Sequence, residues 1–260
     1  MLDRYQEAKD IALKAGELAL EYKRNAQSQG LKIEAKGIQD FVTEADQQVE
    51  HLIRSTLQGK FPEDGFFGEE SDSDIREGQG FWVVDPIDGT SNYMRNVDQW
   101  GVSIAFVKDN RMQIGVIYDP ERDILYHAQK GQGAFCNEQR KMLNDSQPMD
   151  PVIVLGQSRR APLSQYLDAI SVLHEKGVEH RRYGSAALGL AQVVSGQCDG
   201  YFEAELNPWD CLAGLLLIEE AGGVVVSGDQ MAETLTNMSV AAGIKSQQMI
   251  LETLVDIAVD

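Results

Sequence analysis

The stretch Phe81-Trp82-Val83-Val84-Asp85-Pro86-Ile87-Asp88-Gly89-Thr90 decides the fold of this chain. Its first four residues are apolar, which predicts a short buried β-strand. Asp85 and Asp88 follow the strand, and Gly89 allows the backbone to approach a ligand closely. Carboxylates at a strand end point into the crevice where α/β proteins bind ligands, and two neighbouring anions repel each other, so the pair favours a bound cation. Taken alone, the motif is equally typical of a solvated surface turn.

The composition indicates an acidic, globular chain. Of its 260 residues, 43% are hydrophobic, which is enough for one large domain or two closely packed ones. The formal net charge of −18 argues against nucleic acid and membranes as primary partners, because both attract clustered Lys and Arg. Three cysteines without zinc or redox spacing, no signal-peptide pattern and no run of about 20 apolar residues predict a cytoplasmic protein.

Hydrophobic periodicity predicts helices and antiparallel strands in the first half. Apolar residues at helical spacing predict one helix from Leu2 to about Asn25 and another from Thr43 to Leu57, with Thr43 as its N-cap. The polar segment 27–40 predicts a loop or a short hairpin. A short strand is expected at 66–68, and three antiparallel strands follow the opening motif at 101–107, 112–118 and 124–128.

Strands and helices alternate in the second half, which predicts a layered α/β arrangement. The predicted strands span 152–155, 180–183, 200–203 and 224–226, and the predicted helices span 163–175, 184–195 and 208–222. A polar segment at about 137–150 is the candidate boundary between two subdomains, 1–145 and 146–260.

Further acidic residues stand at the ends of predicted elements. Glu69 and Glu70 follow the short strand, and Asp210 lies at the start of a predicted helix. Asp46 is assigned to the N3 position of the second helix as the only acid on its inward face. A capping role and a contact with a bound cation both remain open for Asp46.

With these motifs in order, the chain resembles the inositol monophosphatase family of magnesium-dependent phosphatases. The resemblance covers nearly the whole chain and implies a mixed α/β, layered αβαβα sandwich that forms a homodimer. The segments that carry it are Phe41-Val42-Thr43-Glu44-Ala45-Asp46, Gly68-Glu69-Glu70-Ser71, Asp85-Pro86-Ile87-Asp88-Gly89-Thr90, Gly184-Ser185-Ala186-Ala187, and Trp209-Asp210 leading to Gly222-Gly223.

The resemblance implies magnesium as the cofactor, with about two to three ions per site and manganese able to substitute. Magnesium prefers oxygen ligands, which agrees with motifs that contain carboxylates and neither histidine nor thiolate. In the family pattern, Glu69 and Thr90 orient and deprotonate the attacking water, and Asp46 acts through the third ion. The implied metal ligands are Glu69, Asp85, Asp88, Asp210 and the carbonyl of Ile87.

The resemblance also implies residues that contact a small phosphorylated substrate. Glu203 matches a glutamate that binds substrate hydroxyls, although a strand-end surface acid is the alternative for it. Lys36 resembles a loop lysine of the family, but its register to Asp46 is one residue off. The implied substrate-binding residues are Asp88, Gly89, Thr90, Ala186, Glu203 and Asp210.

The function expected from the resemblance is lithium-sensitive hydrolysis of a phosphate monoester, with inositol monophosphate as the first candidate. Histidinol phosphate, fructose 1,6-bisphosphate and 3′-phosphoadenosine 5′-phosphate are the alternatives within the family. A regulatory protein that binds the transcription machinery on the same fold is the alternative of another class. The arginine pairs Arg159-Arg160 and Arg181-Arg182 are compatible with partner, substrate or dimer contacts, and Leu212 is expected to change packing behind the site.

Overall fold

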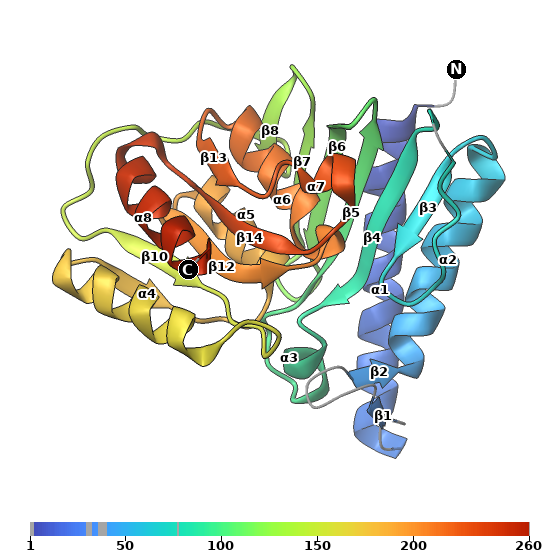
Figure 1. Ribbon diagram of the computed structural model, residues 1–260. Helices are drawn as coiled ribbons and strands as arrows, with labels where there is room; N and C mark the ends of the chain where they lie inside the picture. The colour runs from blue at the N-terminus through green and yellow to red at the C-terminus, as the bar shows by residue number, and fades with distance from the viewer. Residues whose placement is uncertain (1–2, 30–32, 36–40, 77, 260) are drawn as a thin grey trace.

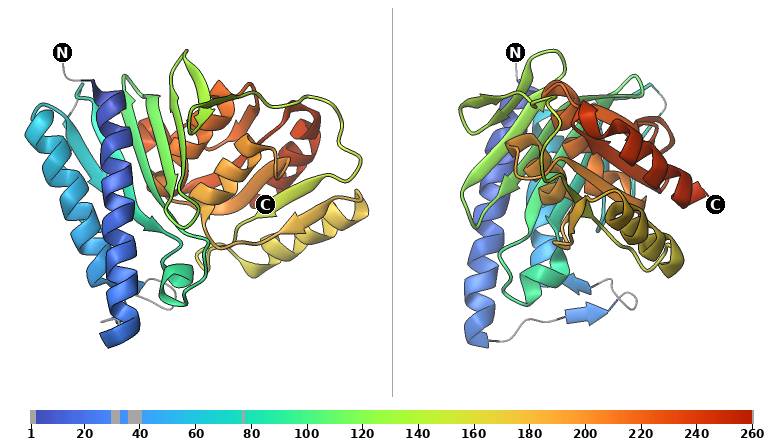
Figure 2. Two further views of the ribbon diagram at one scale, coloured as in Figure 1. Left: turned by 180° about the vertical axis from the view of Figure 1, so that it is seen from behind. Right: turned by 90° about the vertical axis from the view of Figure 1, so that its left-hand side faces the viewer.

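The structure is a computed structural model that describes residues 3–29, 33–35, 41–76 and 78–259. Five layers stack in the order helix, sheet, helix, sheet, helix (Figures 1 and 2). This arrangement confirms the predicted αβαβα sandwich. Lys36 and the side chain of Thr43, for which the sequence predicts roles, lie outside the described part of the chain.

The larger sheet has seven strands in the order β3-β4-β5-β6-β7-β8-β9. β3 and β4 are parallel, and the remaining neighbours are antiparallel. Helices α1 (Arg4–Gln29) and α2 (Glu44–Lys60) cover its outer face. The strands are β3 (Gly65–Gly68), β4 (Phe81–Asp88), β5 (Gly101–Lys108), β6 (Arg111–Asp119), β7 (Ile124–Gln129), β8 (Gly133–Cys136) and β9 (Gln139–Lys141).

The smaller sheet has five strands in the order β11-β10-β12-β14-β13. β10, β11 and β12 are mutually parallel, so their carboxyl ends meet at one edge. Helices α4 (Leu163–Glu175) and α8 (Gln248–Val259) cover its outer face. The strands are β10 (Val152–Leu155), β11 (Glu179–Arg181), β12 (Gly200–Leu206), β13 (Val224–Ser227) and β14 (Met238–Gly243).

Helices α5 (Ala186–Ser195) and α6 (Pro208–Glu220) form the middle layer between the two sheets. Most of their side chains are buried because both helices have a sheet on either side. α6 comes closest to the larger sheet at Gly115, where an added Cβ would lie 2.5 Å from the carbonyl oxygen of Ala213. A glycine is therefore required on β6 at this contact.

Strand β4 is buried along its whole length because helices pack on both of its faces. Trp82 and Val84 point toward α1 and α2, whereas Phe81 and Val83 point toward the middle layer, as the two-residue period of a strand requires. The predicted strand ended at Val84, but β4 continues through Asp88 with a register shift between Asp85 and Asp88. The shift lets Asp85 and Asp88, which are three residues apart, bring their carboxylates together on one side of the strand.

The remaining elements agree with the sequence predictions except at a few ends. The predicted helix 163–175 matches α4 at both ends, and the segment 27–40 contains the first strand of a hairpin, β1 (Ile33–Ala35), whose partner β2 (Phe41–Thr43) lies beyond it. The strand predicted at 180–183 is shorter and shifted, as β11. The elements that we did not predict are β8, β9, α7 (Met231–Thr234), β14, a short 3-10 helix (Lys245–Gln247) and α8.

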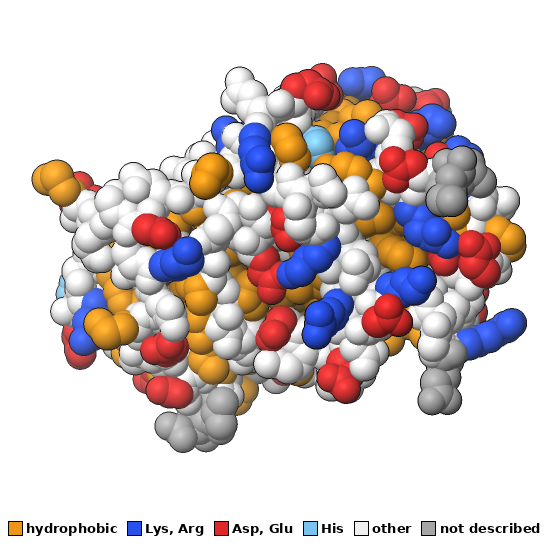
Figure 3. Space-filling view, turned by 90° about the horizontal axis from the view of Figure 1, so that it is seen from above, with side chains coloured by type: hydrophobic (Ala, Val, Ile, Leu, Met, Phe, Trp, Pro, Cys, Tyr) orange, Lys and Arg blue, Asp and Glu red, His pale blue; other side chains and the backbone are white. Residues whose placement is uncertain are grey.

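On the face seen from above, Lys and Arg side chains are interspersed with Asp and Glu (Figure 3). None of the helices in the described ranges combines the length and apolar composition needed to cross a membrane.

We predict that Gly115→Ala lowers the free energy of unfolding by about 1–3 kcal/mol, because its methyl group overlaps the α6 backbone. Gly59→Ala is the matched control, since nothing lies within 4 Å of the added Cβ on α2 and alanine favours a helix. Urea unfolding of both variants measures the difference. Equal stability of the two variants would contradict the close contact between α6 and the larger sheet.

Candidate active site

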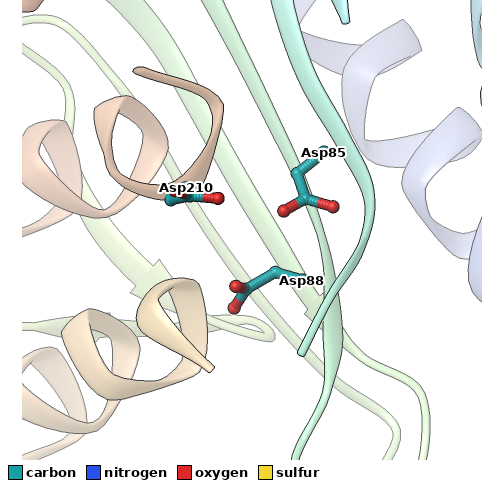
Figure 4. A group of neighbouring side chains, drawn as sticks. All are labelled: Asp85, Asp88 and Asp210. Carbon is teal, nitrogen blue, oxygen red and sulfur yellow. The ribbon is translucent and has the colours of Figure 1, made fainter. Parts of the chain in front are cut away.

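The candidate site lies where one strand end of the larger sheet faces the beginnings of two helices from the middle layer. β4 brings Asp85 and Asp88, α5 begins at Ala186, and α6 brings Asp210 in its first turn. One ligand atom from each aspartate lies within 4.8 Å of the other two (Figure 4). The three residues are therefore close enough to share a single cation.

Asp88 accepts hydrogen bonds from the beginning of α5. The amides of Ala187 and Ala186 donate to its two carboxylate oxygens at 2.8 and 3.3 Å, and the Ser185 hydroxyl also donates to it. Ser185 is itself the N-cap of α5, because its hydroxyl accepts from the amide of Leu188. The positive end of the helix therefore holds the Asp88 carboxylate in place.

Asp210 is held by the capping box of α6. The backbone amide and side-chain amide of Asn207 donate to its carboxylate at 3.0 and 3.1 Å. The Ser103 hydroxyl of β5 donates to the carbonyl of Trp209 at 2.9 Å, which attaches the start of α6 to the larger sheet. The position of Asp210 is thus fixed by a local contact with Asn207 and by the attachment of α6 to the distant strand β5.

Glu69 and Glu70 follow the carboxyl end of β3, and both line the cavity in front of the aspartates. Among the described residues, Glu69 does not join the group of carboxylate atoms within 4.8 Å. Its negative charge nevertheless raises the pKa of Asp85, and the charges of Asp210 and Asp46 raise that of Glu69. The structure therefore brings Glu69 and Asp46 into the same electrostatic cluster as the three aspartates.

The prediction that Asp46 is the only inward-facing acid of the second helix is wrong. Asp46 is buried, but Glu50, one turn later on α2, is also only 3% exposed. The backbone amide of Glu70 donates to the Glu50 carboxylate at 2.8 Å. Glu50 thus positions the segment that carries Glu69. Its spacing of four residues from Asp46 places it on the same helix face, so periodicity indicates its burial, whereas its partner is a distant backbone amide that leaves no local signal.

The turn after β4 has the geometry expected for a substrate contact. Gly89 has a φ of 92°, and an added Cβ would lie 2.9 Å from the carbonyl oxygen of Gln99, so glycine is required. Thr90 opens the short helix α3 (Thr90–Met94), and its hydroxyl donates to the Ile87 carbonyl at 3.1 Å. Gly89 and Thr90 both line the cavity.

Burial raises the pKa of Glu69, Asp85, Asp88 and Asp210, and repulsion from neighbouring carboxylates adds to the shift for the first three. Burial raises the pKa of Asp88 to about 7, with a further contribution from the charge of Asp210. Burial also raises the pKa values of Glu69 and Asp85 well above their usual range and raises that of Asp210. The cluster therefore resists ionisation unless positive charge enters it.

Glu203 lies on β12 on the other side of the cavity, and it is buried rather than a surface acid. The Tyr201 hydroxyl donates to its carboxylate at 2.6 Å. Gly156 leaves room for the carboxylate, because an added Cβ would lie 1.8 Å from an oxygen of Glu203. Burial raises the pKa of Glu203 to about 8. Ala186 also lines the cavity near this wall.

The cavity has a volume of about 690 Å³, which is ample for a small phosphate ester. Carboxylates are the dominant charged groups among its described lining residues, and the basic ones among them are Arg122, Arg160 and Arg182. Buried oxygen ligands without histidine or thiolate at the carboxylate cluster match the preference of magnesium and other hard divalent cations. The residues present thus fit a magnesium site beside a small-molecule cavity.

Sequence reasoning missed several residues that position the site. Ser185, Asn207, Tyr201 and Gly156 each contact one of the predicted site residues. Ser185 and Asn207 carry a recognisable N-cap signal, but that signal does not tell which distant carboxylate the helix start will meet. Tyr201 lies two residues before Glu203 and on the same strand face, which is the one local hint of their contact.

Comparison with known proteins identifies relatives over almost the whole chain. The model of the inositol monophosphatase family matches residues 1–258. The inositol-1-monophosphatase of Mesorhizobium japonicum is 38% identical over 219 residues, which cover 83% of this chain and 82% of that protein. The Nus factor SuhB of Salmonella typhimurium is 39% identical over 194 residues, 73% of each chain. The crystal structure of the extragenic suppressor protein SuhB from Bartonella henselae has a TM-score of 0.88 at 32% identity, with 96% of this chain and 97% of that one covered.

We predict that Asp88→Asn stabilises the metal-free protein at high pH. The raised pKa of Asp88 means that the folded state binds more protons than the unfolded state between about pH 4 and 7, so wild-type stability falls as the pH rises through that window. The advantage of the variant should be on the order of 1–3 kcal/mol at pH 8 and should shrink toward pH 4.

Urea unfolding in the presence of a chelator, at several pH values, measures this advantage. Asp168→Asn is the control, because Asp168 is an exposed carboxylate on α4 outside the cluster. A variant less stable than wild type at pH 8, or an advantage that does not change with pH, would contradict the proposed repulsion.

Proposed function

This chain belongs to the inositol monophosphatase family, and we propose on that premise that it hydrolyses a small phosphate monoester with the help of divalent cations. The observation that carries the proposal is the cluster formed by Asp85, Asp88 and Asp210 beside the cavity. Such a cluster of buried carboxylates is costly without a cation and is well suited to hold one or more magnesium ions.

Glu69, Asp85, Asp88, Asp210 and the Ile87 carbonyl would hold the ions, and Asp46 would act through coordinated water. Magnesium, when bound, supplies positive charge that activates water and stabilises the developing charge on the transferred phosphoryl group and the leaving oxygen. Manganese, with similar oxygen preferences, is expected to substitute.

The chain's own residues then orient the reactants. Because the Thr90 hydroxyl donates to the Ile87 carbonyl, its oxygen is left to accept a hydrogen bond from the attacking water. Glu69, which lines the cavity, would accept the second proton of that water as general base. The start of α3 at Gly89 and Thr90 contacts the phosphate, and Asp210 lies on the side of the leaving oxygen.

Inositol monophosphate is the substrate that we propose first. Glu203, held by Tyr201 on the opposite wall, offers a fixed acceptor for the hydroxyl groups of a polyol, and Ala186 lies beside the ring. A relative of this chain is named an inositol-1-monophosphatase. Histidinol phosphate, fructose 1,6-bisphosphate and 3′-phosphoadenosine 5′-phosphate form the comparison panel.

We predict that Asp88→Asn lowers kcat/KM for inositol 1-phosphate by about 10²–10³-fold or more, because it removes a charged group from the centre of the cluster. Phosphate release with magnesium, and its loss after addition of a chelator, is the measurement. Asp98→Asn is the control, because Asp98 lines the same cavity but is exposed at its rim.

Thr90→Ala should lower kcat by about 10–10²-fold, whereas Thr90→Ser, which keeps the hydroxyl, should retain most of the activity. Full activity of Asp88→Asn would contradict the metal assignment. Full activity of Thr90→Ala with impaired Asp88→Asn would contradict only the role of Thr90.

A regulatory role is the second candidate, because a relative of 39% identity is named a Nus factor. A protein that acts mainly by binding the transcription machinery should recover RNA polymerase subunits from a bacterial extract without catalysing turnover of the substrate panel. We expect turnover instead, because the buried carboxylates have no evident use in a binding surface. Turnover of none of the substrates together with specific recovery of polymerase would reverse the order of the two candidates.

Other properties rest on the family resemblance and belong to the same proposal. We propose a cytoplasmic homodimer whose phosphatase activity is inhibited by lithium. Sedimentation tests the homodimer, and lithium titration during turnover tests the inhibition.

A further inference from the structure

One arginine from each of the pairs Arg159-Arg160 and Arg181-Arg182 lines the cavity. Arg160 and Arg182 line the cavity, whereas their neighbours Arg159 and Arg181 do not. Arg159 is exposed, and Arg181 contacts Glu179 and the carbonyl of His180 outside the cavity. Two guanidinium groups therefore reach the same space from different segments of the chain.

The topology explains why these segments converge. Arg160 lies in the loop after β10, and Arg182 lies in the loop after β11. β10 and β11 are adjacent parallel strands, so their loops leave the sheet at one edge. That edge is the carboxyl end of the parallel strands, where α/β sheets commonly bind ligands. The two arginines thus stand on the wall that faces the carboxylate cluster.

Neither guanidinium is fully committed to a protein partner. The Arg160 guanidinium has a loose ion pair, with its Nε 3.5 Å from Glu205, and no other partner within the described residues. The Arg182 guanidinium has no ion pair or hydrogen bond with a described residue. Arg122, the third basic residue of the cavity, differs because its Nη1 lies 2.7 Å from the Asp119 carboxylate.

The charge of Arg160 reaches the site itself. It lowers the pKa of Glu203 and of Asp210 against the larger effect of burial. Arg160, Glu203 and Asp210 line the same cavity, so a small molecule bound there can contact both the arginine and the carboxylate cluster. Arginine is also the side chain best suited to grip phosphate or carboxylate oxygens in a fork-like geometry.

We propose that Arg160 and Arg182 form a subsite for a second oxyanion of the substrate. Besides inositol monophosphate, the site would then accept small esters with the reacting phosphate at the carboxylate cluster and a second phosphate or a carboxylate at the far end. This inference rests on the proposed phosphatase function and extends its substrate class. The residues of the carboxylate cluster would then carry out the reaction, and the two arginines would select the substrate.

The alternative use of these arginines is to balance the acidic cavity. Charge balance would act on every substrate alike, because it needs no contact with the substrate. A subsite acts only on substrates with a second anionic group. Matched pairs of substrates therefore separate the two explanations.

The experiment compares hydroxyalkyl phosphates with the corresponding alkanediol bisphosphates and phosphooxy-alkanoates over a series of chain lengths. At the length that spans the cavity, we expect the second oxyanion to lower KM by about tenfold after correction for a second reactive end. The two anionic series tell whether phosphate or carboxylate is preferred. Because exposed charges are screened by salt, the advantage should shrink at high ionic strength.

Arg160→Gln and Arg182→Gln should each raise KM for the favoured dianionic substrate more than they raise KM for the hydroxyalkyl phosphate, which has no group to place at the subsite. Arg159→Gln and Arg181→Gln are the matched controls, since each removes the same charge from the neighbouring position in the chain, outside the cavity. Arg160→Lys, which keeps the charge, should retain part of the advantage.

Equal KM values for the anionic and hydroxyl series in the wild type would overturn the inference, and so would equal effects of Arg160→Gln on both. Absence of turnover for all series would contradict the phosphatase function instead. The subsite is then tested by calorimetric binding of the matching bisphosphonates, which are not hydrolysed. Tighter binding to wild type than to Arg160→Gln supports the inference, and equal binding overturns it.

Discussion

The repulsion among buried carboxylates is the constraint on which the rest of this structure depends. Asp85, Asp88 and Asp210 lie within one cation's reach of each other, and Glu69 adds its charge to theirs. Burial and repulsion both oppose ionisation, so the fold must supply favourable contacts for each group. It does so with backbone dipoles, because the beginnings of α5 and α6 hold Asp88 and Asp210. These contacts offset part of the cost and leave the remainder to a bound cation.

The middle layer connects the acidic site to the hydrophobic core that stabilises the whole fold. α6 begins at the site and continues as a helix buried between two sheets, with close backbone contact at Gly115. Its start is also attached to β5 through Ser103. The apolar surface that this helix buries stabilises the fold, and this stabilisation offsets the cost of the buried acidic site. We therefore expect packing changes along α6 to move Asp210 as well as to weaken the core.

Sequence alone predicted the parts of the molecule that depend on local signals. The apolar run before Asp85, the glycine at position 89 and the helices predicted at 184–195 and 208–222 rest on local signals, and the structure contains each of them. The contacts of Ser185 with Asp88 and of Glu50 with the Glu70 amide join distant segments, so no periodicity reports them. The family resemblance implied that these acids form one site. The strand order that brings their segments together was not predicted and is seen only in the structure.

The two walls of the cavity differ in how far family membership constrains them. The carboxylate wall is built from rigid strand and helix ends, and its chemistry requires a particular set of oxygen ligands. The opposite wall is built from loops after β10 and β11, which can change side chains without disturbing either sheet. Family membership is therefore strong support for the type of reaction and weak support for the identity of the substrate. Arg160 lies on one of these loops and acts on Glu203 of β12, and the two side chains together determine whether a hydroxyl-rich or an anionic far end is favoured.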